Sequence, residues 1–210
     1  YTPIALDARF TRLDLRAEQV ADSWVEPKPR PGRARLAFDL RKPIERLGIA
    51  PLTSMFYFGE NQHIPIDDFR PEVHDSDGLS VHTGSDEWIW RPLLNPKRLL
   101  TTAIATTNPR GFGLMQRDRN FDHYEDLEAR YELRPSAWVE PKGNWGPGRV
   151  ELVQIPSPDE TNDNVVAYWT PDVPPKPREP YNLEYRISWQ KEGEAKPPSA
   201  WVVQTRRGKS

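Results

Sequence analysis

The sequence has 210 residues and a hydrophobic fraction of 36%, which fits one large domain or two small ones. Its net charge is −2 and its acidic and basic residues are interleaved, so it offers no basic stripe for a nucleic acid, and no apolar run is long enough to insert into a membrane. The absence of cysteine excludes a disulfide scaffold and thiol catalysis.

Short segments typical of β-strands dominate the chain. The 23 prolines and 12 glycines interrupt it so often that long helices have little room. The β-type runs recur about every ten residues, which is the spacing of a sandwich or barrel. In chain order they are residues 35–40, 54–58, 87–91, 99–106, 112–116, 130–133, 150–155, 164–169, 181–189 and 200–205.

The run 181–189 has the clearest alternation of apolar and polar residues. One face of it collects five large side chains, Tyr181, Leu183, Tyr185, Ile187 and Trp189. Because successive side chains of a strand point to opposite faces, this pattern predicts a half-buried antiparallel strand.

Helical signals are short and few. Residues 14–21, 43–47 and 122–129 could each form about one turn, which is too short to cross over between parallel strands. The predicted fold class is therefore all-β, an antiparallel β-sandwich with few short helices. The proline-rich stretch 170–180 is expected to be an extended connection.

The two ends of the sequence indicate that it belongs to something longer. It starts at Tyr1 instead of methionine and carries no signal peptide, so we expect a piece of a larger protein. The basic tail 206–210 is expected to begin a linker that leaves the domain.

Motifs of several common enzyme classes are missing. There is no GxSxG, no P-loop and no GxGxxG, and the four histidines lack HExxH spacing. His74, Asp75, Asp77 and His82 could be imagined as a metal cluster, but we favour solvated or hydrogen-bonded loop residues. The sequence therefore predicts no metal and no cofactor.

Carboxylates are concentrated in three predicted loops, residues 69–79, 116–128 and 157–164. Two separated carboxyl groups suit glycoside hydrolysis, in which one protonates the leaving oxygen and the other activates water. The alternative interpretation is that these acids cap turns through hydrogen bonds to the backbone, and Asp77 followed by Gly78 is typical of a turn.

Tryptophans lie close to these loops in the sequence. Trp88 and Trp90 share one face of a predicted strand, while Trp138, Trp145 and Trp169 flank the second and third acidic segments. A pyranose presents an apolar face to such rings and its hydroxyls to neighbouring polar groups, so the mixture suits an oligosaccharide groove. Core packing is the alternative for each ring.

Five long segments resemble the periplasmic glucan-biosynthesis family G and D of Gram-negative bacteria. They are residues 47–61 (LGIAPLTSMFYFGEN), 69–79 (FRPEVHDSDGL), 87–93 (EWIWRPL), 108–141 (NPRGFGLMQRDRNFDHYEDLEARYELRPSAWVEP) and 143–169 (GNWGPGRVELVQIPSPDETNDNVVAYW). The resemblance implies a periplasmic protein. It also implies that residues 1–205 are the later half of a large galactose-mutarotase-like sandwich domain that binds or cuts glucan. Residues 206–210 would then lead to an immunoglobulin-like C-terminal domain.

The resemblance also implies a function, that of an inverting endo-β-1,2-glucanase. Asp163 would be the general acid, and Asp75 the general base acting through water and a Tyr131 relay. The implied substrate contacts are Glu160, Asn162, Asn164, Arg134, Trp88, Trp90, Trp138, Asp77, Arg117 and Asp118. The partner is then a β-1,2-glucan oligosaccharide or polysaccharide.

Other functions remain open at this point. The chain could be a non-catalytic glucan-binding or scaffolding module that works with a membrane glucosyltransferase, or a transglycosylase that closes glucan rings. A purely structural sandwich module would scatter Asp75, Tyr131 and Asp163 over the surface instead of bringing them together.

Overall fold

A computed structural model describes the backbone of residues 8–13 and 30–40, and the backbone and side chains of residues 43–63, 67–191 and 196–207. The prediction of a helical turn at residues 14–21 falls outside these described residues. Within the described part of the chain, no helix is long and apolar enough to cross a membrane.

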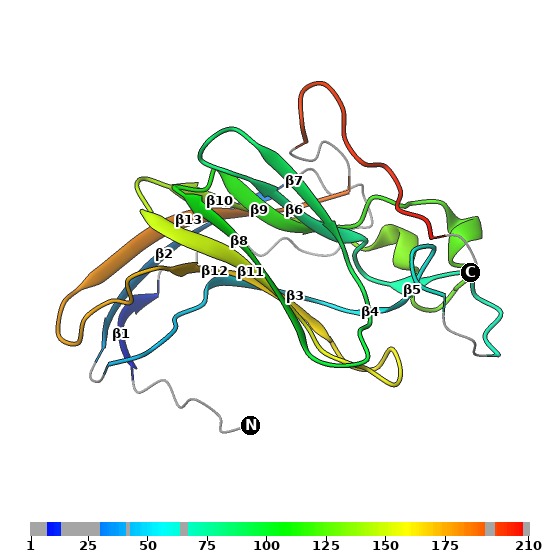
Figure 1. Ribbon diagram of the computed structural model, residues 1–210, viewed down its shortest axis with the longest axis horizontal. Coiled ribbons are helices and arrows are strands. Elements are labelled where there is room, and N and C mark those ends of the chain that lie inside the picture. The colour runs from blue at the N-terminus through cyan, green and yellow to red at the C-terminus, as the bar shows by residue number, and fades with distance from the viewer. Residues whose placement is uncertain (1–7, 14–29, 41–42, 64–66, 192–195, 208–210) are drawn as a thin grey trace.

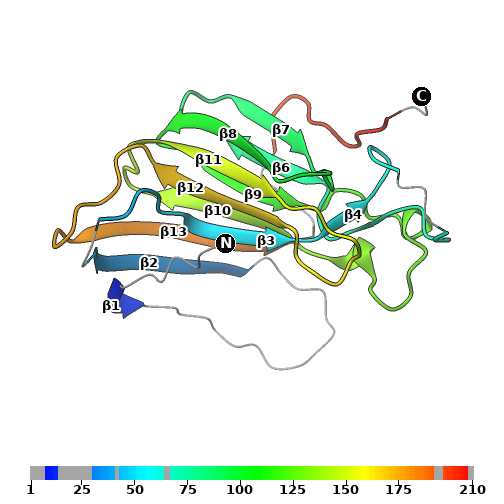
Figure 2. The same ribbon diagram turned by 60° about the horizontal axis from the view of Figure 1, so that its bottom comes forward.

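Two antiparallel sheets form the body of the structure. The seven-stranded sheet contains, in spatial order, β1 (Ala8–Leu13), β2 (Arg30–Leu40), β13 (Tyr181–Gln190), β10 (Ser136–Lys142), β9 (Gly111–Met115), β6 (Gly78–His82) and β7 (Trp88–Pro92). The four-stranded sheet contains β3 (Ile49–Ser54), β12 (Val165–Pro171), β11 (Pro147–Gln154) and β8 (Leu100–Thr107). The predicted all-β antiparallel sandwich is confirmed, and two views show one sheet lying across the other (Figure 1, Figure 2).

The main hydrophobic core lies between the two sheets. Phe112 and Val139 reach it from the seven-stranded sheet, and Val150 and Trp169 reach it from the four-stranded sheet. Trp145 packs tilted against Trp169, with ring centroids 5.1 Å apart. These two tryptophans are therefore core residues, as the packing alternative expects for part of the set.

The clean alternation predicted for residues 181–189 is confirmed in β13. Leu183 is buried, and Tyr181, Tyr185 and Ile187 pack against the same core. Trp189 shares their side of the strand but is 51% exposed, because it lies near the end of the strand where the core stops.

Most other predicted strands overlap observed ones to within a few residues at their ends, although two are wrong. Residues 130–133 form the 3₁₀ helix η2 (Tyr131–Leu133), which begins where Arg130 adopts a left-handed backbone with φ of 49°. Residues 200–205 form no strand; this segment contacts the domain through separate hydrogen bonds of Val202, Gln204 and Thr205 instead of a ladder. The run 54–58 is split at Met55, where the chain leaves β3 and enters β4 (Phe56–Phe58).

The predicted helical turns are mostly absent. Residues 43–47 form no helix, and 122–129 contributes only to the 3₁₀ helix η1 (Phe121–His123) before turning. Gly78, predicted to form a turn, instead begins β6. The Trp90 ring packs directly over it, and a Cβ at this position would lie 2.3 Å from Trp90 Cζ2. The glycine is needed here for close packing.

One end of the sandwich carries the elements that build the candidate site. The short strands β4 and β5 (Val73–His74) pair with each other there, and Figure 1 shows them at the same end as the two 3₁₀ helices. A second hydrophobic cluster supports this end, formed by Met55, Phe58, Val73, Tyr124 and Tyr131.

Candidate active site

Asp75 lies within range of the charge of Asp163 and of the Tyr131 side chain, although the three residues come from segments distant in sequence. Asp75 follows β5, and its backbone N–H donates to the carbonyl of Met55 at 2.9 Å. Tyr131 is the first residue of η2, and Asp163 lies in the loop between β11 and β12. The charge of Asp163 helps raise the pKa of Asp75, and the charge of Asp75 helps raise that of Tyr131.

The Asp75 carboxyl group is partly buried beside a cation. Burial is the main cause that raises its pKa above the ordinary aspartate value, and the charge of Asp163 adds to this effect. The Arg134 guanidinium opposes both, with Nε 3.2 Å from Asp75 Oδ1. A carboxylate with a raised pKa is a stronger base, which is what activation of water requires.

Tyr131 brings a buried phenol within range of the charges of Asp75 and Glu160. Its side chain packs in the second hydrophobic cluster, and the residue is only 4% exposed. Burial raises its pKa, followed by the charges of Glu160 and Asp75. The phenol therefore stays protonated near neutral pH, and such a group both donates and accepts hydrogen bonds.

The loop that carries Asp163 is anchored at its base. Asn164 is 3% exposed, and its Oδ1 accepts a hydrogen bond from the Phe56 N–H at 2.8 Å. Its Nδ2 donates to the carbonyls of Phe56 and Ile155, at 3.0 and 3.1 Å. Asp163 itself is exposed at the surface. The amide of Asn164, predicted to contact substrate, thus connects the loop to β4.

Of three other predicted contacts, Arg134 pairs with Asp75, while Glu160 and Asn162 lie in the same loop as Asp163. Asn162 is exposed, and its Nδ2 donates to Thr161 Oγ1 at 3.1 Å. Glu160 pairs with Arg70, which the sequence analysis did not single out, at 2.8 Å.

The predicted tryptophan contacts lie on the outer face of the seven-stranded sheet. Trp88 stacks on His82 with ring centroids 4.1 Å apart, and on Trp138 at 5.7 Å. Trp138 is 6% exposed, so it is largely a packing residue. Trp90 lies beneath the guanidinium of Arg117, whose Cζ is 3.7 Å from the ring centroid.

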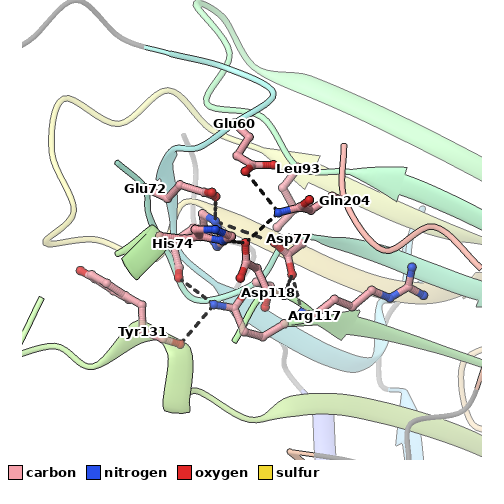
Figure 3. A network of polar contacts seen from close by, with 12 residues as sticks. Glu60, Glu72, His74, Asp77, Leu93, Arg117, Asp118, Tyr131 and Gln204 are labelled. Carbon is pink, nitrogen blue, oxygen red and sulfur yellow. Dashed lines mark hydrogen bonds and ion pairs between the residues drawn. The ribbon is translucent and has the colours of Figure 1, made fainter. Parts of the chain in front are cut away.

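A network of polar contacts connects acids of several loops with the backbone and with other side chains (Figure 3). In it, Asp77 Oδ2 accepts the backbone N–H groups of Arg117 and Asp118, the latter at 3.0 Å. Asp118 Oδ2 lies 2.6 Å from His123 Nδ1 and accepts from Gln204 Nε2 at 3.2 Å. Asp77 and Asp118, predicted as substrate contacts, therefore hold backbone and side chains of the protein.

Buried acids and a histidine extend this network. His74 Nε2 lies 2.8 Å from Glu72 Oε2 and 3.8 Å from Asp77 Oδ1. A cavity of about 20 Å³ adjoins them, enough for roughly one water molecule. The Glu72–His74 pair could not be recognised from the sequence, because ordinary acidic loops contain the same residues.

Some of these residues have the composition of a metal site. Glu60, Glu72, Asp118 and His123 offer ligand atoms that all lie within 4.8 Å of one another, as do Glu72, His74 and Asp77. In each group the histidine pairs with a carboxylate, His74 with Glu72 and His123 with Asp118. The grouping imagined from the sequence differs, because His82 pairs with Asp86 at 2.7 Å and stacks on Trp88.

His74 makes the stability of the protein depend on pH. Burial by itself would lower its pKa, but the hydrogen bond with Glu72 and the charge of Asp77 raise it above 6.5. A raised folded-state pKa stabilises the fold fully below the unfolded value, and this stabilisation is lost as pH rises through the folded value.

We expect the melting temperature of the complete protein to decline as pH rises above 6.5. His74→Gln should cost about 1–3 kcal/mol at lower pH, because Glu72 loses its partner, and should make this decline shallower. Thermal unfolding across a pH series measures both effects. His63→Gln, at an exposed histidine, is the control. Equal slopes for His74→Gln and the natural protein would contradict the assignment.

The C-terminal segment 201–207 lies against the polar network. Gln204 Nε2 donates to Glu60 Oε1 at 3.2 Å, and Arg206 Nε lies 3.0 Å from Glu60 Oε2. The Trp90 indole N–H donates to Thr205 Oγ1 at 3.4 Å. Figure 1 shows this red segment passing over the end of the sandwich that carries the site. The predicted linker at 206–210 thus begins in contact with the domain, and residues 208–210 lie outside the described part.

Comparison with known proteins finds a matching family model and similar curated proteins. The family model described as "Periplasmic glucan biosynthesis protein, MdoG" matches residues 33–210. Glucans biosynthesis protein G of Ralstonia nicotianae is 70% identical over 168 residues, which are 80% of this chain and 33% of the relative. The chain thus spans about a third of the length of that curated relative.

Proposed function

Because the chain belongs to the family of periplasmic glucan biosynthesis proteins, we propose that the complete protein hydrolyses a β-1,2-glucan backbone with inversion of configuration. The proposal is supported by the arrangement around Asp75, which is partly buried and pairs with Arg134 at 3.2 Å. The charge of Asp163 helps raise the pKa of Asp75, and the charge of Asp75 helps raise that of the buried Tyr131. We expect the reaction to take place in the periplasm, where the family description sets its members' role.

The proposed reaction divides proton transfer between the two carboxyl groups. Asp163 gives a proton to the glycosidic oxygen as the bond from that oxygen to the anomeric carbon breaks. Water forms the new bond to this carbon from the opposite face, and its proton passes through the Tyr131 hydroxyl to Asp75. Inverting enzymes separate their carboxyl groups by about 6.5–9.5 Å to admit water, and a relay through tyrosine allows a longer separation.

The exposed polar side chains near Asp163 are the proposed glucan contacts. Glu160 and Asn162 share the loop of Asp163, and Arg134 pairs with Asp75; all three carry groups that would bind sugar hydroxyls. Trp88, Trp90 and Arg117 would bind more distant glucose units along the outer face of the seven-stranded sheet, where segment 201–207 contacts Trp90 and Arg117. The glucose units next to Asp75 and Asp163 would be bound by the loops that carry these two residues.

Product stereochemistry tests the proposal. The complete protein, given linear β-1,2-glucan, should release new reducing ends that appear first as the α-anomer, followed by proton NMR before mutarotation. Linear β-1,3-glucan is the matched control substrate and should yield none. Initial release of the β-anomer would contradict inversion. Binding without turnover would instead indicate a scaffolding module, and cyclic products without new reducing ends a transglycosylase.

A further inference from the structure

One arginine, Arg70, joins three carboxylates at the candidate active site. Its side chain is 14% exposed and forms a two-pronged contact with Asp68, from Nε to Oδ1 at 3.0 Å and from Nη2 to Oδ2 at 2.7 Å. Its Nη1 donates to Asp126 Oδ2 at 2.9 Å and lies 2.8 Å from Glu160 Oε2. Several charge-assisted contacts on one planar guanidinium fix its orientation.

Two partners of Arg70, Asp126 and Glu160, belong to the segments that carry Tyr131 and Asp163. Asp126 Oδ1 accepts the N–H groups of Glu128 and Ala129, at 2.9 and 2.7 Å, and so shapes the turn that leads into Tyr131. Glu160 lies in the same anchored loop as Asp163. Arg70 itself precedes β5 and Asp75, so a single side chain connects all three segments.

Arg70 also sets part of the charge around Tyr131. After the dominant effect of burial, the charges of Glu160, Asp75 and Asp126 raise the pKa of Tyr131, while the charge of Arg70 lowers it. Without Arg70, three carboxylates would face one another with no cation between them, and like charges so placed repel. The loops that carry them would then be expected to move apart.

We propose that Arg70 is the positioning residue of this site, holding the segments of Asp75, Tyr131 and Asp163 in one arrangement. The effect of Arg70 on kcat rests on the proposed glucan hydrolysis. Its effect on the order of the loops that it connects does not depend on that proposal. The planar fork is essential, because lysine is a point charge on a flexible stem and cannot reproduce contacts with three carboxylates at once.

The test compares three variants of the complete protein. Arg70→Gln should lower kcat about 10- to 100-fold with KM changed less than about threefold, because misplaced groups cost rate more than binding. Arg70→Lys should not restore the rate, because a point charge on a flexible stem cannot orient three carboxylates. Arg149→Gln, which removes an arginine of the four-stranded sheet paired with Glu151 and Asp172, should leave kcat unchanged.

Hydrogen exchange supplies a readout independent of activity. Arg70→Gln should speed amide exchange in residues 126–133 and 157–164 together, and Arg149→Gln should not. If the natural protein shows no hydrolysis, the proposed function fails, but coupled loosening of the two segments still supports the positioning role. Unchanged exchange in both segments overturns the inference, as does an Arg70→Lys variant with full kcat.

Discussion

Replacing Asp163 with Asn should lower kcat on linear β-1,2-glucan by about 100- to 10,000-fold and leave affinity within a few fold. An amide of the same shape keeps hydrogen bonds to sugar but has no acidic proton to give to the leaving oxygen. The fold should persist, because the loop is anchored by the buried Asn164 and Asp163 itself is exposed. Steady-state assay of reducing ends, with thermal unfolding alongside, measures the result.

Asp159→Asn is the matched control for this experiment. Asp159 is an exposed aspartate of the same loop, and its Oδ1 accepts from the N–H and Oγ1 of Thr161, at 2.9 and 2.6 Å. This variant should retain kcat within a few fold. A substrate whose leaving group needs no protonation should lose much less rate in Asp163→Asn than glucan does. Equal activity of Asp163→Asn and the natural protein would remove Asp163 from the mechanism.

Local pattern was sufficient for much of the fold. β13 and β8 could be predicted because each alternates along its length between a side facing the core and a side facing water. The same argument fails for β10, where Pro141 and two charged residues hide a strand that pairs with both β9 and β13. The strand at β10 forms because of its pairing with β9 and β13, which its local sequence does not indicate.

The site was predictable only in part, for a similar reason. Resemblance selected Asp75 and Asp163, but composition could not distinguish them from Asp77 and Asp118, whose oxygens hold the protein's own backbone and side chains. Arg70 carried no sequence signal, because two of its three carboxylate partners, Asp126 and Glu160, come from segments that meet it only in the folded chain. A run of acids looks the same whether it caps turns or faces a substrate.

Replacing Asp75 with Asn should also lower kcat by about 100- to 10,000-fold, because no group then accepts the proton of the attacking water. The change should cost less than about 1 kcal/mol of stability, since its ion pair with Arg134 is partly exposed. Azide, an anion that attacks without a general base, should restore turnover and give a glucosyl azide of inverted configuration. Asp172→Asn is the control, at an exposed aspartate that follows β12. This variant should keep its kcat without azide.

The pH profile of the natural protein tests the same assignment without removing the carboxylate. Asp75 acts as a base only when ionised, so kcat/KM should fall as pH drops through a pKa that lies above 3.8, raised by burial and by the charge of Asp163. Arg134→Gln removes the cation that lowers this pKa, so the acidic limb should move to still higher pH while Asp75 remains in place. Arg134 Nε lies 3.2 Å from Asp75 Oδ1, so its removal must change the pKa of this carboxyl group. An acidic limb that stays at the same pH in Arg134→Gln would therefore mean that another group takes the proton.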